Sequence, residues 1–209
     1  MKIKSIIVGP IQSNCYIAYD EKSSDAIVID PGEEAGKIMR EIDQNHLKVR
    51  YIVCTHGHFD HIGAVAEVKK KTGAKVAINK KDIEIYRHAG ELAASWGFHI
   101  DQPPDPDLLV EDGDEIVAGS LRFRVMITPG HSPGGICLYG IGVLFTGDTI
   151  FAGSVGRTDL YGGDMGELKK SFARLISLPS DTVILPGHGS SSTIREEKTT
   201  NFFIHELSI

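Results

Sequence analysis

The sequence predicts an α/β protein in which two β-sheets pack together and helices cover their outer faces. Short β-prone stretches form two clusters, one in each half of the chain, and helical periodicities lie between and after them. Both halves run strands first and then helix and strand, which gives a weak two-fold repeat. Sheets and helices that alternate in this way bury their apolar faces against each other as layers.

The first half is divided by turn signals such as Gly9-Pro10 and by changes of apolar period. Its predicted strands are residues 3–8, 14–19, 26–29, 49–55 and 75–78. Its predicted helices contain Ala35, Ile38, Met39 and Ile42 at helical spacing, then residues 62–71, then about 80–94. Residues 95–108 hold Trp96 and three prolines without a period. We expect an irregular loop there, in which the tryptophan anchors packing or covers a pocket.

The second half is richer in strands. Arg122 and Arg124 alternate with apolar residues, which is the pattern of a strand with one buried face. The predicted strands are residues 121–127, 136–139, 143–146 and 183–185. A Gly-rich loop covers residues 152–163, an amphipathic helix contains Leu168, Phe172, Leu175 and Ile176, and residues 194 to about 206 form a terminal helix.

Composition narrows the class of protein. With 209 residues the chain can bury a full core, and we expect one domain over residues 1–209. The net charge of −6 argues against binding to nucleic acid or to an anionic membrane, and no apolar run has membrane-spanning length. Three widely spaced cysteines in apolar contexts suit a reducing compartment, and no signal peptide is recognised, so we expect a cytoplasmic protein.

One stretch carries most of the chemistry. After the apolar strand at residues 49–55, His56, His58, Asp60 and His61 fall within six residues. Imidazole and carboxylate groups are ligands for borderline divalent metals. Alternation places His56 and His58 on one side of an extended segment, while Asp60 and His61 follow a turn and face a second point. Two pairs of ligands at two points predict two metal ions.

Three later residues repeat the order of apolar strand, Gly-containing turn and metal-type residue. They are His131, Asp148 and His188. The predicted first metal site is His56, His58 and His131, and the second is Asp60, His61 and His188. Asp148 would bridge both metals with its two oxygens, and two cations would hold a bridging water as hydroxide near neutral pH. The other histidines, which lack this context, are His46, His88, His99 and His205.

This motif set resembles that of the metallo-β-lactamase-fold hydrolase superfamily over nearly the whole chain. The histidines at 131 and 188 stand in Thr-Pro-Gly-His and Pro-Gly-His-Gly segments, and Ser13-Asn14-Cys15-Tyr16 opens the resemblance. The resemblance implies a four-layer αβ/βα sandwich of two mixed β-sheets, with helices on the outer faces and a two-metal site at one edge. The metals implied are two divalent ions, zinc first, with iron or manganese as alternatives.

Within the superfamily, the segments Gly147–Ser154 and Gly156–Asp159 are similar to those of short, single-domain type II glyoxalases, which are hydroxyacylglutathione hydrolases. Longer members carry a C-terminal helical domain with much of the glutathione site. Here about twenty residues follow His188, so those contacts cannot be transferred. The resemblance predicts a thioester hydrolase with a small-molecule substrate. Asp60 and Asp148 are the predicted catalytic carboxylates, with Asp60 also orienting the hydroxide.

Three residues are candidates for contact with the substrate. Arg157 follows Asp148 in the Gly-rich loop and would bind an anionic group, although an ion pair with Asp159 that holds the loop is slightly favoured. Tyr161 and Arg195 are weaker candidates. A thiolate leaves without a strong acid, so a site of metals and histidines suits a thioester.

Other activities compete with this reading. A persulfide dioxygenase shares the fold and motifs and would hold one iron through His56, His131 and Asp148. A true β-lactamase is disfavoured because those enzymes lack an aspartate at the position of Asp148 and are exported. A nuclease would be expected to have a further domain and a basic surface. A non-enzymatic scaffold would be expected to lack ligands, whereas all seven are present.

Overall fold

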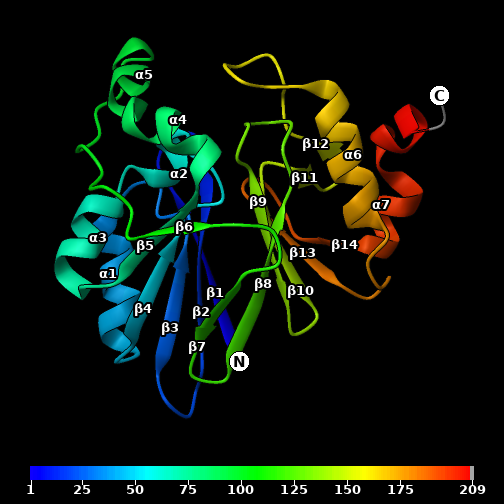
Figure 1. Cartoon of the computed structure of the whole chain (residues 1–209). Helices are drawn as coiled ribbons and strands as arrows, with labels where there is room; N and C mark the ends of the chain where they lie inside the picture. The colour runs from blue at the N-terminus through cyan, green and yellow to red at the C-terminus, as the bar shows by residue number, and fades with distance from the viewer. Residues whose placement is uncertain (208–209) are drawn as a thin grey trace.

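The computed structural model describes residues 1–207, and in them the chain forms two mixed six-stranded sheets that pack face to face (Figure 1). The first sheet runs in sequence order, with antiparallel pairing up to β3 and parallel pairing from β3 onward. Its strands are β1 (Lys2–Val8), β2 (Ser13–Tyr19), β3 (Asp25–Ile29), β4 (Lys48–Val53), β5 (Lys75–Asn79) and β6 (Leu108–Val110).

The second sheet has the order β14-β13-β10-β9-β8-β7, and a short hairpin of β11 and β12 stands apart from it. The pairs β7·β8, β8·β9 and β9·β10 are antiparallel, whereas β10 and β13 are parallel. The strands are β7 (Glu115–Ala118), β8 (Leu121–Ile127), β9 (Ile136–Gly140), β10 (Val143–Gly147), β11 (Ile150–Phe151), β12 (Ser154–Val155), β13 (Val183–Pro186) and β14 (Ser192–Thr193).

Helices cover the outer face of each sheet, so the layers are αβ/βα as predicted (Figure 1). One apolar cluster, with Ile27 and Phe123 among its members, lies between the sheets. A second cluster joins the first sheet to its helices, and a third joins β9, β10 and β13 to α6 and α7. The helices are α1 (Ala35–Gln44), α2 (Phe59–Ile62), α3 (Val65–Thr72), η1 (Lys80–Asp82), α4 (Ile83–Arg87), α5 (Ala89–Ser95), α6 (Met165–Ile176), α7 (Ile194–Thr200) and η2 (Phe202–Leu207).

Most of the longer predicted elements are confirmed, but three predicted helices are interrupted. The helix expected at 62–71 is divided into α2 and α3 because Ala64 N donates to the Pro31 carbonyl oxygen at 2.9 Å, outside the helical pattern. A Cβ at Gly63 would also collide with the Gly32 carbonyl oxygen. The segment 80–94 is divided into η1, α4 and α5, and the terminal segment into α7 and η2. The short strands β6, β7, β11, β12 and β14 were not predicted.

Strand β4 ends at Val53, two residues before the predicted end. Cys54 N still donates to the Ala77 carbonyl oxygen of β5 at 2.9 Å, but Thr55 N donates to the Asp30 carboxylate at 2.7 Å, so the pairing ends there. The strand β8 agrees with its predicted pattern, since Arg122 and Arg124 are exposed and their neighbours in the strand are buried.

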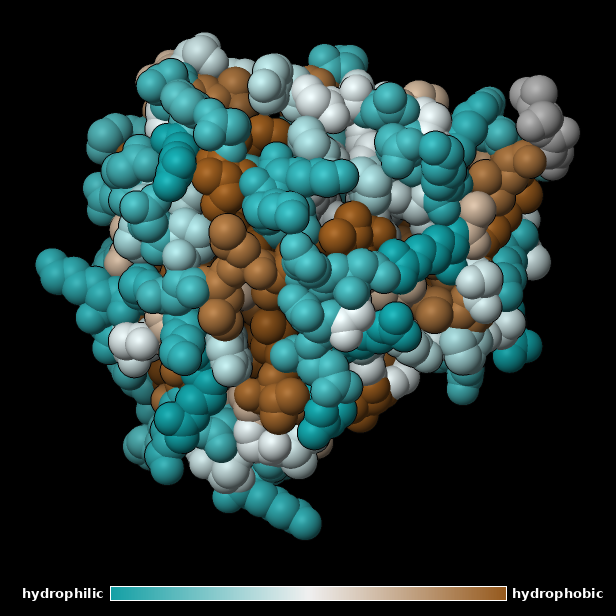
Figure 2. Space-filling model, in the orientation of Figure 1, coloured by the Kyte–Doolittle hydropathy of each residue, from teal (hydrophilic) through white to brown (hydrophobic). Residues whose placement is uncertain are grey.

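The surface is mainly hydrophilic, with one apolar strip in view. Leu109 on β6 and Val117 on β7 are exposed, and Figure 2 shows hydrophobic surface along the middle of this face, where the edges of the two sheets adjoin. The three cysteines are buried and unpaired within the described chain. Among residues 1–207, no helix has both the length and the apolar character needed to cross a membrane.

The topology brings four loops to one edge of the sandwich. Strands β8, β10 and β13 run in the same direction, since β8 and β10 are both antiparallel to β9 and β13 is parallel to β10. Their carboxyl ends therefore meet at one end of the second sheet. The loop after β4 comes to the same place from the first sheet, and these four loops carry all the predicted metal ligands.

Candidate metal centre

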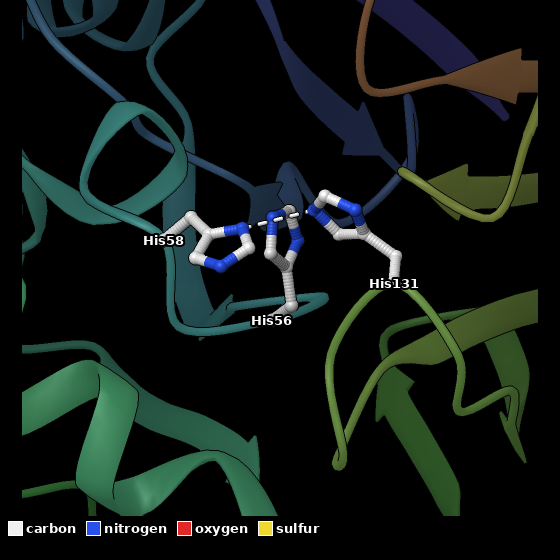
Figure 3. Close-up of side chains that lie close together, drawn as sticks. All are labelled: His56, His58 and His131. Atoms are coloured by element: carbon white, nitrogen blue, oxygen red, sulfur yellow. Dashed lines mark hydrogen bonds between the residues drawn. The ribbon is translucent and has the colours of Figure 1, made fainter. Parts of the chain in front are cut away.

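Three imidazoles converge from two loops to form the first ligand group, His56, His58 and His131. Each offers one ring nitrogen, and these nitrogens lie within 4.8 Å of one another. The closest pair is His58 Nδ1 and His131 Nε2, at 2.9 Å (Figure 3). All three residues are buried, with relative exposures of 2% for His56 and 6% for His58 and His131.

The second ligand group consists of Asp60, His61 and His188, whose ligand atoms also lie within 4.8 Å of one another. His61 Nε2 and His188 Nε2 are 3.1 Å apart, and Asp60 Oδ2 is 3.2 Å from His188 Nε2. His61 is fully buried, whereas the other two are half-buried. This group combines a carboxylate with two imidazoles and has contact with solvent.

Asp148 lies between the two groups. Its Oδ2 is 3.6 Å from His131 Nε2 in the first group and 3.6 Å from His188 Nε2 in the second, while its Oδ1 is 3.4 Å from His61 Nε2. A Cβ at Gly187 would collide with Asp148 Oδ1, so glycine there leaves room for the carboxylate. The structure thus brings all seven predicted ligands together, and Asp148 occupies the position predicted for a bridge.

Hydrogen bonds at Nδ1 direct the Nε2 atom of three imidazoles toward the other predicted ligands, where its lone pair can bind a cation. A ring nitrogen that donates to an oxygen carries the proton, so the other nitrogen keeps its lone pair. The Nδ1 partners are Thr55 Oγ1 for His56 (3.0 Å), the Arg157 carbonyl oxygen for His131 (2.7 Å) and Asp30 Oδ2 for His61 (3.2 Å). Thr55 can accept from His56 because its own hydroxyl donates to Asp30 Oδ2, at 2.7 Å.

The residues present fit divalent metal ions. Within residues 1–207, His56 Nε2 and Asp148 Oδ1 are buried and have no hydrogen-bond partner. A buried polar atom without a partner costs free energy, and a cation would satisfy both atoms. Five imidazoles and two carboxylates are also the donor set that zinc, iron and manganese accept.

The two groups differ in how they bind protons. Burial lowers the pKa of His56 well below its usual value and lowers the pKa of His58 to about 4. Both imidazoles are therefore neutral and able to bind metal at pH 7. Burial also disfavours the charged form of His61 and His188, but nearby carboxylates, Asp60 foremost for His61, outweigh it and raise the pKa of both.

The same charges act on the carboxylate of the second group. Burial alone would raise the pKa of Asp60, but the charge of His61 and the hydrogen bond with His188 hold that pKa below its usual value. Asp60 is therefore ionised at neutral pH and can serve as a metal ligand. Ser13 Oγ also donates to Asp60 Oδ2 at 3.0 Å, which fixes the orientation of the carboxylate.

Two buried aspartates that support the loops were missed in the sequence. Asp30 holds both Thr55 and His61, and its backbone has a positive φ of 50°. Asp82 accepts hydrogen bonds from Gly57 N at 2.9 Å and from Ser132 Oγ at 2.8 Å, and also from Gly134 N. It therefore joins the loop of His56 and His58 to the loop of His131.

The N-terminal segment of the first sheet holds the last of the four loops. Asn14 N donates to the Gly187 carbonyl oxygen at 2.7 Å, and Asn14 Nδ2 donates to the carbonyl oxygens of Pro186 and Gly189, both at 2.9 Å. Tyr16 Oη donates to the Pro186 carbonyl oxygen at 2.7 Å. These bonds cross from one sheet to the other and fix the position of His188.

A cavity of about 150 Å³ opens over the ligands. The ligands His58, Asp60, His131, Asp148 and His188 line it, together with Ile11, Phe59, Leu92, Trp96, Arg157 and Leu160. The ring of Trp96 packs edge-on against Phe59 at 6.1 Å, so the loop tryptophan both anchors packing and lines the cavity.

The structure places the three substrate candidates differently. Arg157 lines the cavity and forms a bidentate ion pair with Asp159, at 2.6 and 2.7 Å. Tyr161 is 80% exposed and lines a neighbouring cavity that also includes His58. Arg195 is exposed on α7 and is absent from the described lining of both cavities.

Comparison with known proteins gives the family. Residues 8–188 match the metallo-beta-lactamase superfamily. Hydroxyacylglutathione hydrolase GloC of Haemophilus influenzae is 35% identical over 213 residues, which cover 100% of both chains. The structure of TTHA1623 in a di-iron-bound form has a TM-score of 0.89 and 38% identity, covering 96% of this chain and 99% of that one. The BLEG-1 B3 metallo-beta-lactamase has a TM-score of 0.89 and 35% identity, covering 97% and 99%. The chain belongs to the metallo-β-lactamase superfamily.

Proposed function

We propose that this chain is a cytoplasmic, metal-dependent thioester hydrolase whose substrates are S-acylglutathione-type small molecules. The observation that carries the proposal is the pair of ligand groups that Asp148 joins beneath an open cavity. The likeness to GloC over the full length of both chains supports thioester cleavage. The buried, unpaired cysteines support a reducing compartment.

The seven ligands would hold two metal ions. His56, His58 and His131 would hold one ion, and the group of Asp60, His61 and His188 the other, with Asp148 shared between them. Zinc is the ion we propose first, and the di-iron form of TTHA1623 makes iron the principal alternative. When bound, the ions would polarise the thioester carbonyl and supply a water that is deprotonated near neutral pH.

The residues of the chain position the reactants. Asp60, with one oxygen held by Ser13, would orient the attacking water. A C–O bond forms at the acyl carbon and the C–S bond breaks, with its electron pair leaving on sulfur. A thiol has a pKa near 8.5, so the thiolate leaves without a proton from the protein. The described lining of the cavity accordingly includes no glutamate to act as a general acid. The products are a carboxylate and a thiol.

Arg157 has a structural role in this proposal. Its guanidinium is paired with Asp159, and its carbonyl oxygen fixes the tautomer of His131. The side chain therefore braces the Gly-rich loop through Asp159, while the backbone of the same residue holds His131.

The test starts from protein purified without added metal. Elemental analysis gives the metal content, and the same sample is assayed for S-lactoylglutathione hydrolysis and for oxygen uptake with glutathione persulfide. We expect two metals per chain with hydrolysis, and a His58→Ala variant that loses at least one metal and the activity. His205→Ala, an exposed histidine on η2, is the matched control and should keep both. One iron with oxygen uptake and no hydrolysis would establish the dioxygenase instead.

The likeness to BLEG-1 favours β-lactam hydrolysis as the second candidate, because the identity of 35% extends over 97% of the chain. Nitrocefin hydrolysis by the same sample tests it. A rate for nitrocefin that exceeds the rate for every thioester would replace the thioesterase proposal.

A further inference from the structure

A second cavity adjoins the metal centre. Its volume is about 330 Å³, and its lining is His58, Glu84, Ile85, His88, Leu92, Leu160 and Tyr161. His58, Leu92 and Leu160 also line the cavity over the ligands, so the two spaces meet at a metal-type residue. We call this second space the acyl groove. Its volume is within the range of small-molecule pockets, about 300–1,000 Å³.

The described lining of the acyl groove is mainly apolar and includes no lysine or arginine. Ile85, Leu92, Leu160 and the ring of Tyr161 form its walls, and no described lining residue is Lys or Arg. Glu84 is the only described carboxylate in the lining, and a bound anion would be repelled by it. The nearest arginine in the adjoining cavity, Arg157, is already paired with Asp159.

Both walls are fixed to the metal centre. The wall formed by α4 and α5 follows Asp82, whose carboxylate is bound by Gly57 and Ser132. The opposite wall is the loop of Leu160, which Asp164 N joins to the Gly130 carbonyl oxygen, next to His131, at 2.8 Å. The groove is therefore preformed, and binding an apolar group in it does not require ordering of the walls.

We infer that the acyl groove binds the acyl group of the substrate, and that this group is an uncharged hydrocarbon chain of several carbons. The inference rests on the proposed thioesterase function and adds the substrate class to it. The groove meets the metal centre at His58, so a thioester carbonyl at the ligands would direct one of its two substituents into the groove. Glutathione carries two carboxylates and does not suit a space with Glu84 and no cation. The acyl substituent is the one that fits.

The first experiment measures kcat/KM of the metal-loaded enzyme for acetyl, butyryl, hexanoyl and succinyl thioesters of N-acetylcysteamine. Each buried methylene is worth about fourfold, and we expect kcat/KM to rise at least about tenfold from acetyl to hexanoyl. Succinyl, which is anionic, should be the poorest of the longer chains. Leu160→Asn should reduce the hexanoyl-to-acetyl ratio to less than about threefold, and Glu84→Gln should improve succinyl relative to hexanoyl.

The control is Leu109→Asn, the same substitution on exposed β6, which should leave the ratio as in the wild type. A second measurement does not depend on catalysis. Acetamide, butyramide and hexanamide are titrated into the protein, with binding followed by calorimetry and by fluorescence of Trp96, the only tryptophan in the sequence. We expect affinity to rise with chain length in the wild type and to lose this dependence in Leu160→Asn.

The outcomes separate the inference from the proposed function. Thioester hydrolysis with a flat or inverted acyl series, together with amide affinity that does not depend on length, overturns the groove and leaves the thioesterase in place. Chain-length-dependent amide binding without any thioester hydrolysis supports the groove and overturns the thioesterase.

Discussion

The two ligand groups have three donors each but different surroundings. The first group consists of three buried imidazoles without a carboxylate of its own. The second contains Asp60, and its members Asp60 and His188 have side chains 16% and 25% exposed. The first group is thus a buried site of imidazoles alone, whereas the second carries the negative charge of Asp60 and is partly exposed to solvent.

The difference indicates which carboxylates would balance the charge of a metal ion in each group. A cation in the first group would have Asp148 as its carboxylate, so its charge balance depends on a residue shared with the other group. A cation in the second group would keep Asp60 even without Asp148. We therefore expect the second group to exchange its metal with solvent more readily and the first group to depend more on the bridge.

The largest effect is expected from Asp148→Asn, because this carboxylate touches both groups. Metal content should fall from two to at most one per chain, with the remaining metal in the second group. Activity should fall by more than the roughly 10–100-fold that loss of an outer-shell partner costs. Elemental analysis and kcat/KM measure the two effects. Asp105→Asn, an exposed carboxylate paired with Arg87, is the control. Two metals per chain and wild-type activity in Asp148→Asn would show that the two groups do not depend on a shared carboxylate at this position.

Substitution of Asp30 or Asp82, the buried aspartates that support the ligand loops, should have a smaller effect on metal binding. Asp30→Asn weakens the bond that orients His61 and, through Thr55, the bond that orients His56. We therefore expect metal affinity to fall about 10–100-fold in the second group, which Asp30 contacts directly, and less in the first group. Asp82→Asn should instead weaken the first group, since Asp82 joins its two loops. Competition with a chromogenic chelator resolves the tighter and weaker metals. Equal losses of metal affinity from both groups in both variants would contradict the expectation that Asp30 supports mainly the second group and Asp82 mainly the first.

The pH dependence of stability in metal-free protein should show opposite signs for the two groups. His56 and His58 bind protons more weakly in the folded state, so acidification from pH 6.5 to about 4 should favour unfolding. His61 and His188 bind protons more strongly when folded, and their contribution, complete below pH 6.5, should be lost as pH rises above it.

We therefore expect the free energy of unfolding to be highest near pH 6.5 and to fall on each side, by on the order of 3 kcal/mol on the acid side, where the pKa of His58 is lowered to about 4. Urea unfolding of chelator-treated protein across pH 4–9 measures this. His188→Asn should flatten the alkaline side alone. A profile that rises steadily through pH 9 would show that the carboxylates of the second group do not hold its imidazoles protonated.

The smallest effect is expected from Ser13→Ala, which removes one hydrogen bond to Asp60. A single such bond is worth about 1 kcal/mol, and we expect about a fivefold loss of metal affinity from the second group with no change in the first. Competition with a chromogenic chelator measures this loss of affinity. A loss from the first group instead would mean that Ser13 acts on the sheet interface and not on Asp60.

The clustering of the seven candidate ligands was predictable because they stand at glycine-containing turns after apolar strands, and the shared edge follows from strand direction. Asp30 and Asp82 carry no such signal. Asp30 stands in a turn segment, Asp-Pro-Gly, and Asp82 stands in a helical pattern, so each resembles an ordinary polar residue until the loops it binds are in place. The two-residue strands were missed for a related reason, since an alternating pattern needs more than two residues to be visible.

The interruptions of the predicted helices could not be predicted for the same reason. Residues 62–71 have a continuous helical pattern, yet the backbone leaves the helix where Ala64 meets Pro31. The competing hydrogen bond comes from a segment about thirty positions earlier, and local periodicity does not contain it. Long-range polar contacts decide these details, while apolar periodicity decides the layers.

The bonds between Asn14 and the Pro186 loop join residues that are 172 positions apart. Contacts of such separation close a very long loop, so they form late when a chain folds. His188 is also among the last ligands to leave the ribosome, and it reaches its place only when the loop after β13 docks against the earliest strands. The metal centre is therefore complete only after nearly the whole chain has been made.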